Sequence, residues 1–374
     1  MFGSVLIIIC TLMHVYVLWR VSSVPFVQRY IALKYLLLIG LILWIVLFSG
    51  FFFGRGRTGI LASALEFFAM NWMAVVFLIF ISLLAADILT GFGFFFPRLA
   101  ASIRGWALIA GALLSLTALI QGHRAPEVDK YEVHLTNLPK ELDGTIIVAL
   151  ADLHLDSRLG DQWLASRVAQ VNEQKPDIIV LLGDIVERST SEKEDTFANG
   201  LTHLSAPLGV WAVLGNHEYF GRRDDNIASV FDKAGIPVLR GTWKELKPGL
   251  ILAGVDPPRR SMDSREIVPD SITPALKGRP EGATILLSHF PMGAEEAAKD
   301  GVDLMLSAHT HGGQIWPFSY IVQASFHLLA GEYIVNGMPI IVSRGAGTWG
   351  PRMRLWKPGE ISRITLRKKV VKGK

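Results

Sequence analysis

Five short clusters of carboxylate, amide and imidazole side chains occur after residue 150 of the sequence. They are Asp152-Leu153-His154, Gly183-Asp184, Gly215-Asn216-His217-Glu218, His289 and His309-Thr310-His311. Oxygen and imidazole donors without thiolates suit manganese, iron or zinc. Two such ions that share a carboxylate can clamp a phosphate and acidify a bridging water, and a separate imidazole can protonate the leaving alkoxide. The clusters therefore predict a hydrolytic site with two metal ions.

Each cluster directly follows an apolar run that is typical of a buried strand. These runs cover 145–151, 177–182, 209–214, 283–288 and 304–308, and further strands are predicted at 250–254, 339–343 and 361–366. Helical patterns at 161–174 and 191–204 separate the first three runs. Asp152, Asp184 and Asn216 follow one another at intervals of 32 residues, which suits βαβ units in a layered α/β domain. Because open α/β sheets place their sites at the carboxyl ends of the strands, we expect the clusters to meet at one edge.

In order and spacing, the clusters resemble the five sequence blocks of the calcineurin-like metallophosphoesterase superfamily. Within it, the chain is most similar to the membrane-associated bacterial branch of YkuE-like and YaeI-like phosphoesterases, a placement that the stretches 312–314 (GGQ) and 343–347 (SRGAG) support. The resemblance covers residues 140–370 and implies a four-layer α/β/β/α sandwich. One departure is visible, since Ala308 stands before the last cluster where many relatives have glycine. This is a small change at a strand end, and we expect the site to tolerate it.

The resemblance also implies a role for each cluster. The implied ligands are Asp152, His154 and His311 for a first metal, and Asn216, His289 and His309 for a second. Asp184 would bridge the two ions. His217 would protonate the leaving group or contact the phosphate, and Asn216 would touch the phosphate as well as its metal. The implied cofactors are two divalent metal ions, with manganese favoured over iron or zinc.

Three arginines outside the clusters are candidates for contact with a substrate phosphate. They lie in the glycine-containing stretch 343–358 and are Arg344, Arg352 and Arg354. Guanidinium groups bind phosphate with two parallel hydrogen bonds, although ordinary surface charge is an equally good interpretation. Glu218 is expected to orient its neighbours. Asp156 either supports the metal site or is a solvated loop acid.

The first 121 residues differ in composition from the rest. Of the whole chain, 51% is hydrophobic, and the excess lies almost wholly in this part. Four apolar runs, 2–21, 35–53, 67–89 and 101–120, are each near the ~20 residues that a helix needs to cross a bilayer. A buried helical bundle in a soluble domain is the alternative, whereas four runs in series exclude a cleaved signal peptide. We expect a four-helix transmembrane domain at 1–121, a linker and entry segment at 122–140 and a catalytic domain at 141–374.

The basic residues of the loops indicate an orientation. Loops one and three carry five Arg or Lys residues and loop two carries two, which favours loops one and three in the cytoplasm. Four spans then place the catalytic domain on the extracytoplasmic side of a bacterial inner membrane. Arg124 and Lys130, which follow the last span, argue against this orientation.

Charge and cysteine content limit the partners. The net charge is +4 at pH 7, but the basic residues are scattered apart from the tail at 367–369, so nucleic-acid binding is not indicated. Cys10 is the only cysteine, which excludes an internal disulfide and any multi-cysteine metal site. The segment 315–329 is rich in aromatic residues. It is either a core helix or loop, or an apolar lip that rests on the bilayer and admits a lipid's acyl chains, through Trp316, Phe318, Tyr320, Phe326 and Leu329.

These features predict a membrane-bound enzyme that hydrolyses a phosphoester or pyrophosphate bond. Attachment to the bilayer favours a lipid-linked substrate, and analogy with relatives suggests one like UDP-diacylglucosamine. One alternative is a membrane-anchored phosphatase or phosphodiesterase for a soluble substrate. Another is a non-catalytic ligand-sensing or transport component. A domain that only binds would be expected to lose Asp184 or His217, and both are present.

Overall fold

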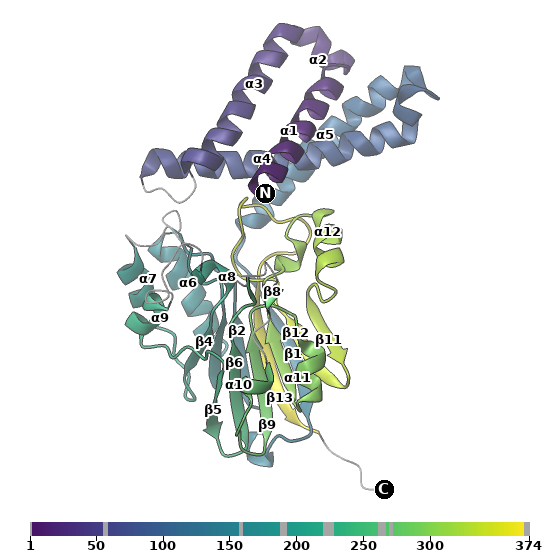
Figure 1. Ribbon diagram of the computed structural model, residues 1–374. Helices are drawn as coiled ribbons and strands as arrows, with labels where there is room; N and C mark the ends of the chain where they lie inside the picture. Colours follow the sequence, from purple (N-terminus) through teal and green to yellow (C-terminus); the bar gives the residue numbers. More distant parts are fainter. Residues whose placement is uncertain are drawn as a thin grey trace. The chain divides into compact units, whose positions relative to one another are not determined.

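The computed structural model of the protein describes residues 2–54, 59–156, 160–187, 193–219, 228–260, 267–268 and 272–369. The chain forms two compact units (Figure 1). The helical unit comprises Met1–Arg124 and Gly350–Lys357. The sandwich unit comprises Ala125–Trp349 and Pro358–Lys374.

Apolar helices make up the helical unit. They are α1 (Phe2–Val21), α2 (Pro25–Tyr30), α3 (Leu33–Ser49) with the π-helical turn η1 (Gly50–Gly54), α4 (Ile60–Thr90) with the 3₁₀ turn η2 (Gly91–Gly93), and α5 (Pro97–Gly122). Among the described residues, three stretches are long and apolar enough to cross a membrane, namely Leu33–Gly54, Ile60–Gly93 and Pro97–Gly122. A shorter apolar helix covers Val5–Val21. The four apolar runs of the sequence fall on α1, α3, α4 and α5, which fit the expected transmembrane region.

A buried carboxylate joins three of these helices. Asp87 in α4 accepts hydrogen bonds from Tyr16 (2.5 Å) and Arg104 (2.7 Å) and pairs with Arg20 at 2.5 Å. Charged groups in an apolar segment are costly unless they are paired. The pairing therefore accounts for Asp87 within a membrane helix, and it fixes the end of α1 and the start of α5 against the end of α4.

Two β-sheets form the centre of the sandwich unit. The first has the strand order β1-β13-β2-β3-β4 and the second has the order β11-β12-β10-β9-β6-β5. The strands of the first are β1 (Glu127–Leu135), β2 (Ile146–Leu150), β3 (Ile178–Leu182), β4 (Val210–Val213) and β13 (Glu360–Lys368). Those of the second are β5 (Thr242–Lys247), β6 (Leu250–Val255), β9 (Ala283–Ser288), β10 (Leu304–Ser307), β11 (Gly331–Val335) and β12 (Met338–Val342). The short strands β7 (Arg259–Arg260) and β8 (Ile267–Val268) pair separately.

Helices cover the outer faces of both sheets (Figure 1). On the first sheet lie α6 (Asp161–Asn172), α7 (Glu194–Leu201) and α9 (Ser229–Ala234), and on the second lie α10 (Ile272–Ala275) and α11 (Ala294–Lys299). Alternate residues of β2 point to opposite faces, so Val148 packs under the helices while Ile147 packs between the sheets. Both faces of the central strands are buried, which explains their continuous apolar runs. The expected four-layer α/β/β/α arrangement is confirmed.

A strand lies within the segment predicted as linker and entry to the catalytic domain. Within 122–140, residues Glu127–Leu135 form β1, which pairs in parallel with β13 at the opposite end of the domain sequence. The short 3₁₀ turn η3 (Lys140–Leu142) then leads toward β2. Residues 350–357, which lie within the predicted catalytic domain, group with the helical unit. Both differences arise from contacts between distant parts of the chain.

Candidate metal centre

The five clusters converge because their strands run in parallel. β2, β3 and β4 are parallel neighbours in the first sheet, and β6, β9, β10 and β12 are parallel neighbours in the second. The carboxyl ends of parallel strands lie at one edge of a sheet. The loops after β2, β3, β4, β9 and β10 therefore bring together Asp152, His154, Asp184, His217, His289, His309 and His311. Asn216 directly precedes His217.

Glycine lets two of these loops approach closely. A Cβ atom on Gly215 would lie 2.1 Å from Oδ1 of Asp184, and one on Gly183 would lie 2.8 Å from Nδ1 of His289. Gly183 also has φ of +86°, which residues with a side chain rarely adopt. The glycines that precede Asp184 and Asn216 are thus required by the packing of the cluster.

Five of the clustered residues have left-handed backbone conformations without being glycine. Their φ values are 51° for Asp152, 48° for His154, 51° for Asp184, 70° for His309 and 51° for His311. Each such residue costs about 1–2 kcal/mol relative to ordinary backbone geometry. Strain of this kind persists where surrounding structure imposes it, and it is concentrated at functional sites.

The first group of converging ligand atoms comes from Asp152, His154 and His311, which lie within 4.8 Å of one another. Nε2 of His154 is 3.0 Å from Nε2 of His311, and the latter atom is 3.6 Å from Oδ1 of Asp152. All three residues are buried. Two imidazole nitrogens and a carboxylate oxygen thus face one small volume, which is the donor set of a transition-metal site.

Asp184 belongs to both of the remaining groups. One consists of Asp184, His289 and His309, and the other of His154, Asp184 and His217. Oδ2 of Asp184 is 3.2 Å from Nε2 of His289 and 4.0 Å from Nε2 of His154. Nδ1 of His309 lies 3.2 Å from Nε2 of His289. The Asp184 carboxylate therefore stands between the two sets of imidazoles.

The electrostatics of the cluster favour positive charge. Burial lowers the pKa of His154, but the hydrogen bond and charge of Glu187 and the charges of Asp184 and Asp152 outweigh it and raise that pKa to about 9. Burial also lowers the pKa of His289, but the charge and the hydrogen bond of Asp184 outweigh this effect and raise that pKa to about 9. Burial and the positive charge of His289 instead lower the pKa of His309 to about 3.

The cluster also contains an oxygen suited to a cation. Among the described residues, the buried side-chain Oδ1 of Asn216 has no hydrogen-bond partner. Leaving a buried polar atom unsatisfied costs about 1–3 kcal/mol. Carbonyl and carboxylate oxygens, together with imidazole nitrogens, are ligands for divalent metals. The residues present therefore fit metal ions.

Sequence comparison agrees with this geometry. The family model described as calcineurin-like phosphoesterase matches residues 146–313, which contain all five clusters. A metallophosphoesterase of Aquifex aeolicus is 35% identical over 65% of this chain and 92% of its own length. The chain belongs to the calcineurin-like metallophosphoesterase family. It is accordingly a metal-dependent phosphoester hydrolase, and the family assignment made from the five clusters is confirmed.

Two other relatives bear on the branch and the membrane. The metallophosphoesterase YkuE of Bacillus subtilis is 28% identical over 73% of this chain and 96% of its own length. A zebrafish (Danio rerio) transmembrane protein with a metallophosphoesterase domain is 31% identical over 70% of this chain and 62% of its own length. The first supports the YkuE-like branch. Together with the apolar helices, the second supports membrane association.

Glu187 is a carboxylate of the metallophosphoesterase site that the sequence clusters did not predict. Oε1 of Glu187 lies 2.7 Å from Nδ1 of His154, and Oε2 lies 2.9 Å from Nδ1 of His217. By holding both Nδ1 atoms, Glu187 directs both Nε2 atoms toward Asp184, as carboxylates behind metal-bound histidines do. Its position three residues after Asp184, in a loop that follows a strand, could have indicated this role.

Glu218 fastens the loops that carry the cluster. Its carboxylate accepts hydrogen bonds from the backbone N–H groups of Asp184 (2.9 Å), Ile185 (2.7 Å), Val186 (3.1 Å) and Gly215 (2.7 Å). The loop after β3 is thereby tied to α8 (Asn216–Tyr219), in which Glu218 lies. Asp156, which was predicted either to support the metal site or to be a solvated loop acid, is buried.

The three candidate arginines lie in different surroundings. Nη1 of Arg344 pairs with Asp129 at 2.8 Å and with Glu360 at 3.1 Å. Arg352 and Arg354 belong to the helical unit, where their backbone N–H groups donate to Asn71 (3.1 Å) and to Ala118 (2.9 Å). Their contact with phosphate stays a prediction.

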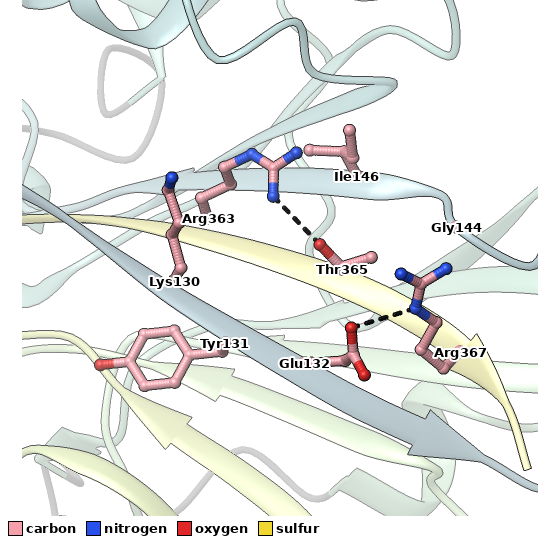
Figure 2. A pocket seen from close by; sticks show the side chains of 8 residues that line it. All are labelled: Lys130, Tyr131, Glu132, Gly144, Ile146, Arg363, Thr365 and Arg367. Carbon is pink, nitrogen blue, oxygen red and sulfur yellow. Dashed lines mark hydrogen bonds and ion pairs between the residues drawn. The ribbon is translucent and has the colours of Figure 1, made fainter.

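An open pocket of 460 Å³ lies apart from the metal cluster (Figure 2). It occupies the outer face of β1, β13 and β2 and contains no imidazole. In it Arg367 donates to Glu132 at 3.1 Å and Arg363 donates to Thr365 at 3.1 Å (Figure 2). Internal pairing of this kind is typical of a solvated polar surface, so we place the chemistry at the imidazole cluster.

Proposed function

We propose that the protein is a membrane-bound phosphoesterase with two metal ions that hydrolyses a phosphoester or pyrophosphate bond of a lipid-linked substrate. The observation that carries the proposal is the position of Asp184 between two groups of imidazole and carboxylate donors, with His217 beside them. The apolar helices of the same chain support attachment of this chemistry to a bilayer.

The ligand assignment follows the three groups. Asp152, His154 and His311 would hold one ion, and Asp184 would be shared. His289 and His309, together with the buried oxygen of Asn216, would hold the second ion. Two divalent ions, when bound, acidify a water and neutralise the charge of a phosphate. Manganese suits this mixture of oxygen and imidazole donors, and iron and zinc are alternatives.

His217 is placed to move a proton. Its Nδ1 faces Glu187 at 2.9 Å, so the opposite nitrogen, Nε2, faces the cluster at 4.0 Å from Oδ2 of Asp184. The contact with Glu187 fixes the orientation of the imidazole ring. His217 can therefore carry a proton on Nε2 and release it to the oxygen that leaves the phosphate.

The membrane helices support a lipid-linked substrate on the extracytoplasmic side of a bacterial inner membrane. Asp87, Arg20 and Arg104 hold the end of α1, the end of α4 and the start of α5 together, which places loops one and three on one side. These are the loops with more basic residues, which favours their placement in the cytoplasm. Four spans then put the catalytic domain on the opposite side of the membrane. A UDP-diacylglucosamine-like molecule, which combines a pyrophosphate with acyl chains, is the specific candidate.

The test uses the full chain purified in detergent with manganese. We expect about two metal ions per chain, hydrolysis of bis(p-nitrophenyl) phosphate, and loss of hydrolysis after dialysis against EDTA with recovery on adding manganese. The value of kcat/KM should be higher for UDP-diacylglucosamine in mixed micelles than for the soluble diester. Absence of turnover with manganese, iron and zinc alike would contradict the enzymatic proposal. Equal values for the two substrates would contradict its lipid part.

A further inference from the structure

One lobe of the sandwich unit begins at the metal cluster and ends beside it. This lobe, residues 311–329, contains the 3₁₀ turn η6 (His311–Gly313) and α12 (Phe318–Ser325). Its two ends meet where the Thr310 hydroxyl donates to the Leu329 carbonyl. Inside the lobe, the ring of Phe326 lies 5.1 Å from that of His309, which stacks on Phe290 at 3.8 Å. The base of the lobe is therefore fixed to a candidate metal ligand.

The outer part of the lobe is apolar and exposed. None of the residues of α12 is buried, and Tyr320 and Ile321 keep 64% and 59% of their surface exposed. No Asp, Glu, Lys or Arg occurs between Asp303 and Glu332. At about 100° per residue, Ile321 and Gln323 point to nearly opposite sides of α12. The helix thus has an uncharged polar side and an apolar side that the sandwich unit does not cover.

A second apolar side chain extends this surface to the proton donor. The side chain of Gln314 accepts from the Trp349 backbone N–H at 2.9 Å and donates to its carbonyl at 3.1 Å. Trp349 is 43% exposed, and its ring lies 6.3 Å from that of His217. Figure 1 shows α8, which carries His217, and α12 at the same end of the sandwich unit. The lobe and Trp349 together form an apolar rim at the site.

The connection to the membrane helices indicates what covers this rim. The helix α5 ends at Gly122 and β1 begins at Glu127, so only four residues join the sandwich unit to a helix able to cross a membrane. Four residues reach at most about 14 Å. Tryptophan and tyrosine are enriched at the interface between water and bilayer, where amphipathic helices lie with their apolar side in the acyl boundary. A bilayer is therefore the surface within reach that matches the composition of α12.

We propose that α12 lies in the interfacial layer of the lipid bilayer, with Ile321 inserted, and that Trp349 lines the path from this layer to His217. A lipid then presents its phosphate to the cluster while its acyl chains remain in the membrane. The delivery of substrate rests on the proposed function, whereas the insertion of α12 can be tested without any turnover.

The test measures depth in the bilayer at matched positions. Replacing Cys10, the only cysteine, by alanine gives a background in which single cysteines are introduced as Ile321→Cys, Gln323→Cys and Ile334→Cys. Ile334 lies on β11 and is 72% exposed, so it controls for apolar exposure elsewhere in the sandwich unit. Each full-length protein carries a bimane label, shows the unfolding temperature of the background, and is placed in nanodiscs of phosphatidylethanolamine and phosphatidylglycerol with or without a doxyl-labelled lipid.

We expect the doxyl lipid to quench the label at position 321 at least threefold more than the labels at positions 323 and 334. Equal quenching at 321 and 323, or at 321 and 334, would overturn the insertion of α12. Hydrolysis of bis(p-nitrophenyl) phosphate by the unsubstituted protein in the same nanodiscs is measured separately. Selective quenching at 321 without hydrolysis would support the insertion of α12 and contradict the enzymatic proposal. Hydrolysis without selective quenching would support the enzymatic proposal and contradict the insertion of α12.

Discussion

Oε2 of Glu187 lies 2.9 Å from Nδ1 of His217, on the side of the imidazole ring that faces away from the metal-binding cluster. The other carboxylate oxygen of Glu187 lies 2.7 Å from Nδ1 of His154. One carboxylate therefore sets the ring orientation of a proposed metal ligand and of the proposed proton donor. Its own pKa is held far below the ordinary glutamate value, because both imidazoles outweigh the effect of burial.

The first prediction concerns this shared carboxylate. Glu187→Gln retains the shape of the side chain but offers an acceptor oxygen to only one of the two imidazoles and carries no charge. Loss of such a supporting carboxylate typically costs 10–100-fold, so we expect kcat to fall by about that factor. Steady-state hydrolysis of bis(p-nitrophenyl) phosphate at saturating manganese measures it. Glu132→Gln, at an exposed acid on β1, is the control and should keep the kcat of the unsubstituted protein.

His217→Ala should separate proton transfer from metal binding. General acid catalysis contributes about 10²–10⁴-fold, and we expect a loss of kcat in that range. The remaining donors of both proposed metal positions are intact in this variant, so metal content per chain, measured by mass spectrometry, should stay within error of the unsubstituted protein. Full turnover by the variant would show that its assigned role is wrong.

Asp184→Ala should remove metal and turnover together. Asp184 is common to two groups of donors, and its Oδ2 is 3.2 Å from Nε2 of His289. We expect metal content to fall by at least one ion per chain and hydrolysis to fall by at least ~10³-fold, since a two-metal site needs its shared ligand. The matched control is Asp161→Ala at the exposed start of α6, which should change neither quantity. Retention of two metal ions after loss of Asp184 would contradict the shared position.

Gly215→Ala should destabilise the fold of the site. The added Cβ atom would lie 2.1 Å from Oδ1 of Asp184 and 2.4 Å from its backbone nitrogen, and neither atom can move without displacing the cluster. Overpacking of this kind costs about 1–3 kcal/mol. Thermal unfolding of the full chain in detergent should show a lower midpoint. Gly160→Ala meets nothing within 4 Å at φ of −76° and should leave the midpoint nearly unchanged. Similar midpoints for the two variants would argue against the close approach.

The sequence alone was sufficient for the metal cluster because local chemistry and local periodicity coincide there. Asp152, Asp184 and His289 each follow an apolar run, and each run forms a central parallel strand. Parallel pairing brings the loops of each sheet to one edge, and the packing of the two sheets brings the two edges together. The apolar runs before residue 121 likewise predict helices of membrane-crossing length, because hydrophobic length is a local property of the chain.

Tertiary structure decided what depends on partners far apart in the sequence. Arg344 is predicted to contact phosphate, and the pairing of β1 with β13 places Asp129 and Glu360 beside its guanidinium. The predicted linker became a strand through the same pairing. No local pattern records such contacts, because a strand's partner is set by packing across the whole domain.

The sequence likewise could not predict the direction in which side chains in loops point. Glu187 and Trp349 lie in loops, where no period of 2 or 3.6 residues fixes which way a side chain points. The fold brings both residues to His217, and the hydrogen bonds of Gln314 hold Trp349 there. The sequence thus determined which chemistry the protein carries and near which strands. The fold decided which residues orient that chemistry, and which exposed surface adjoins it.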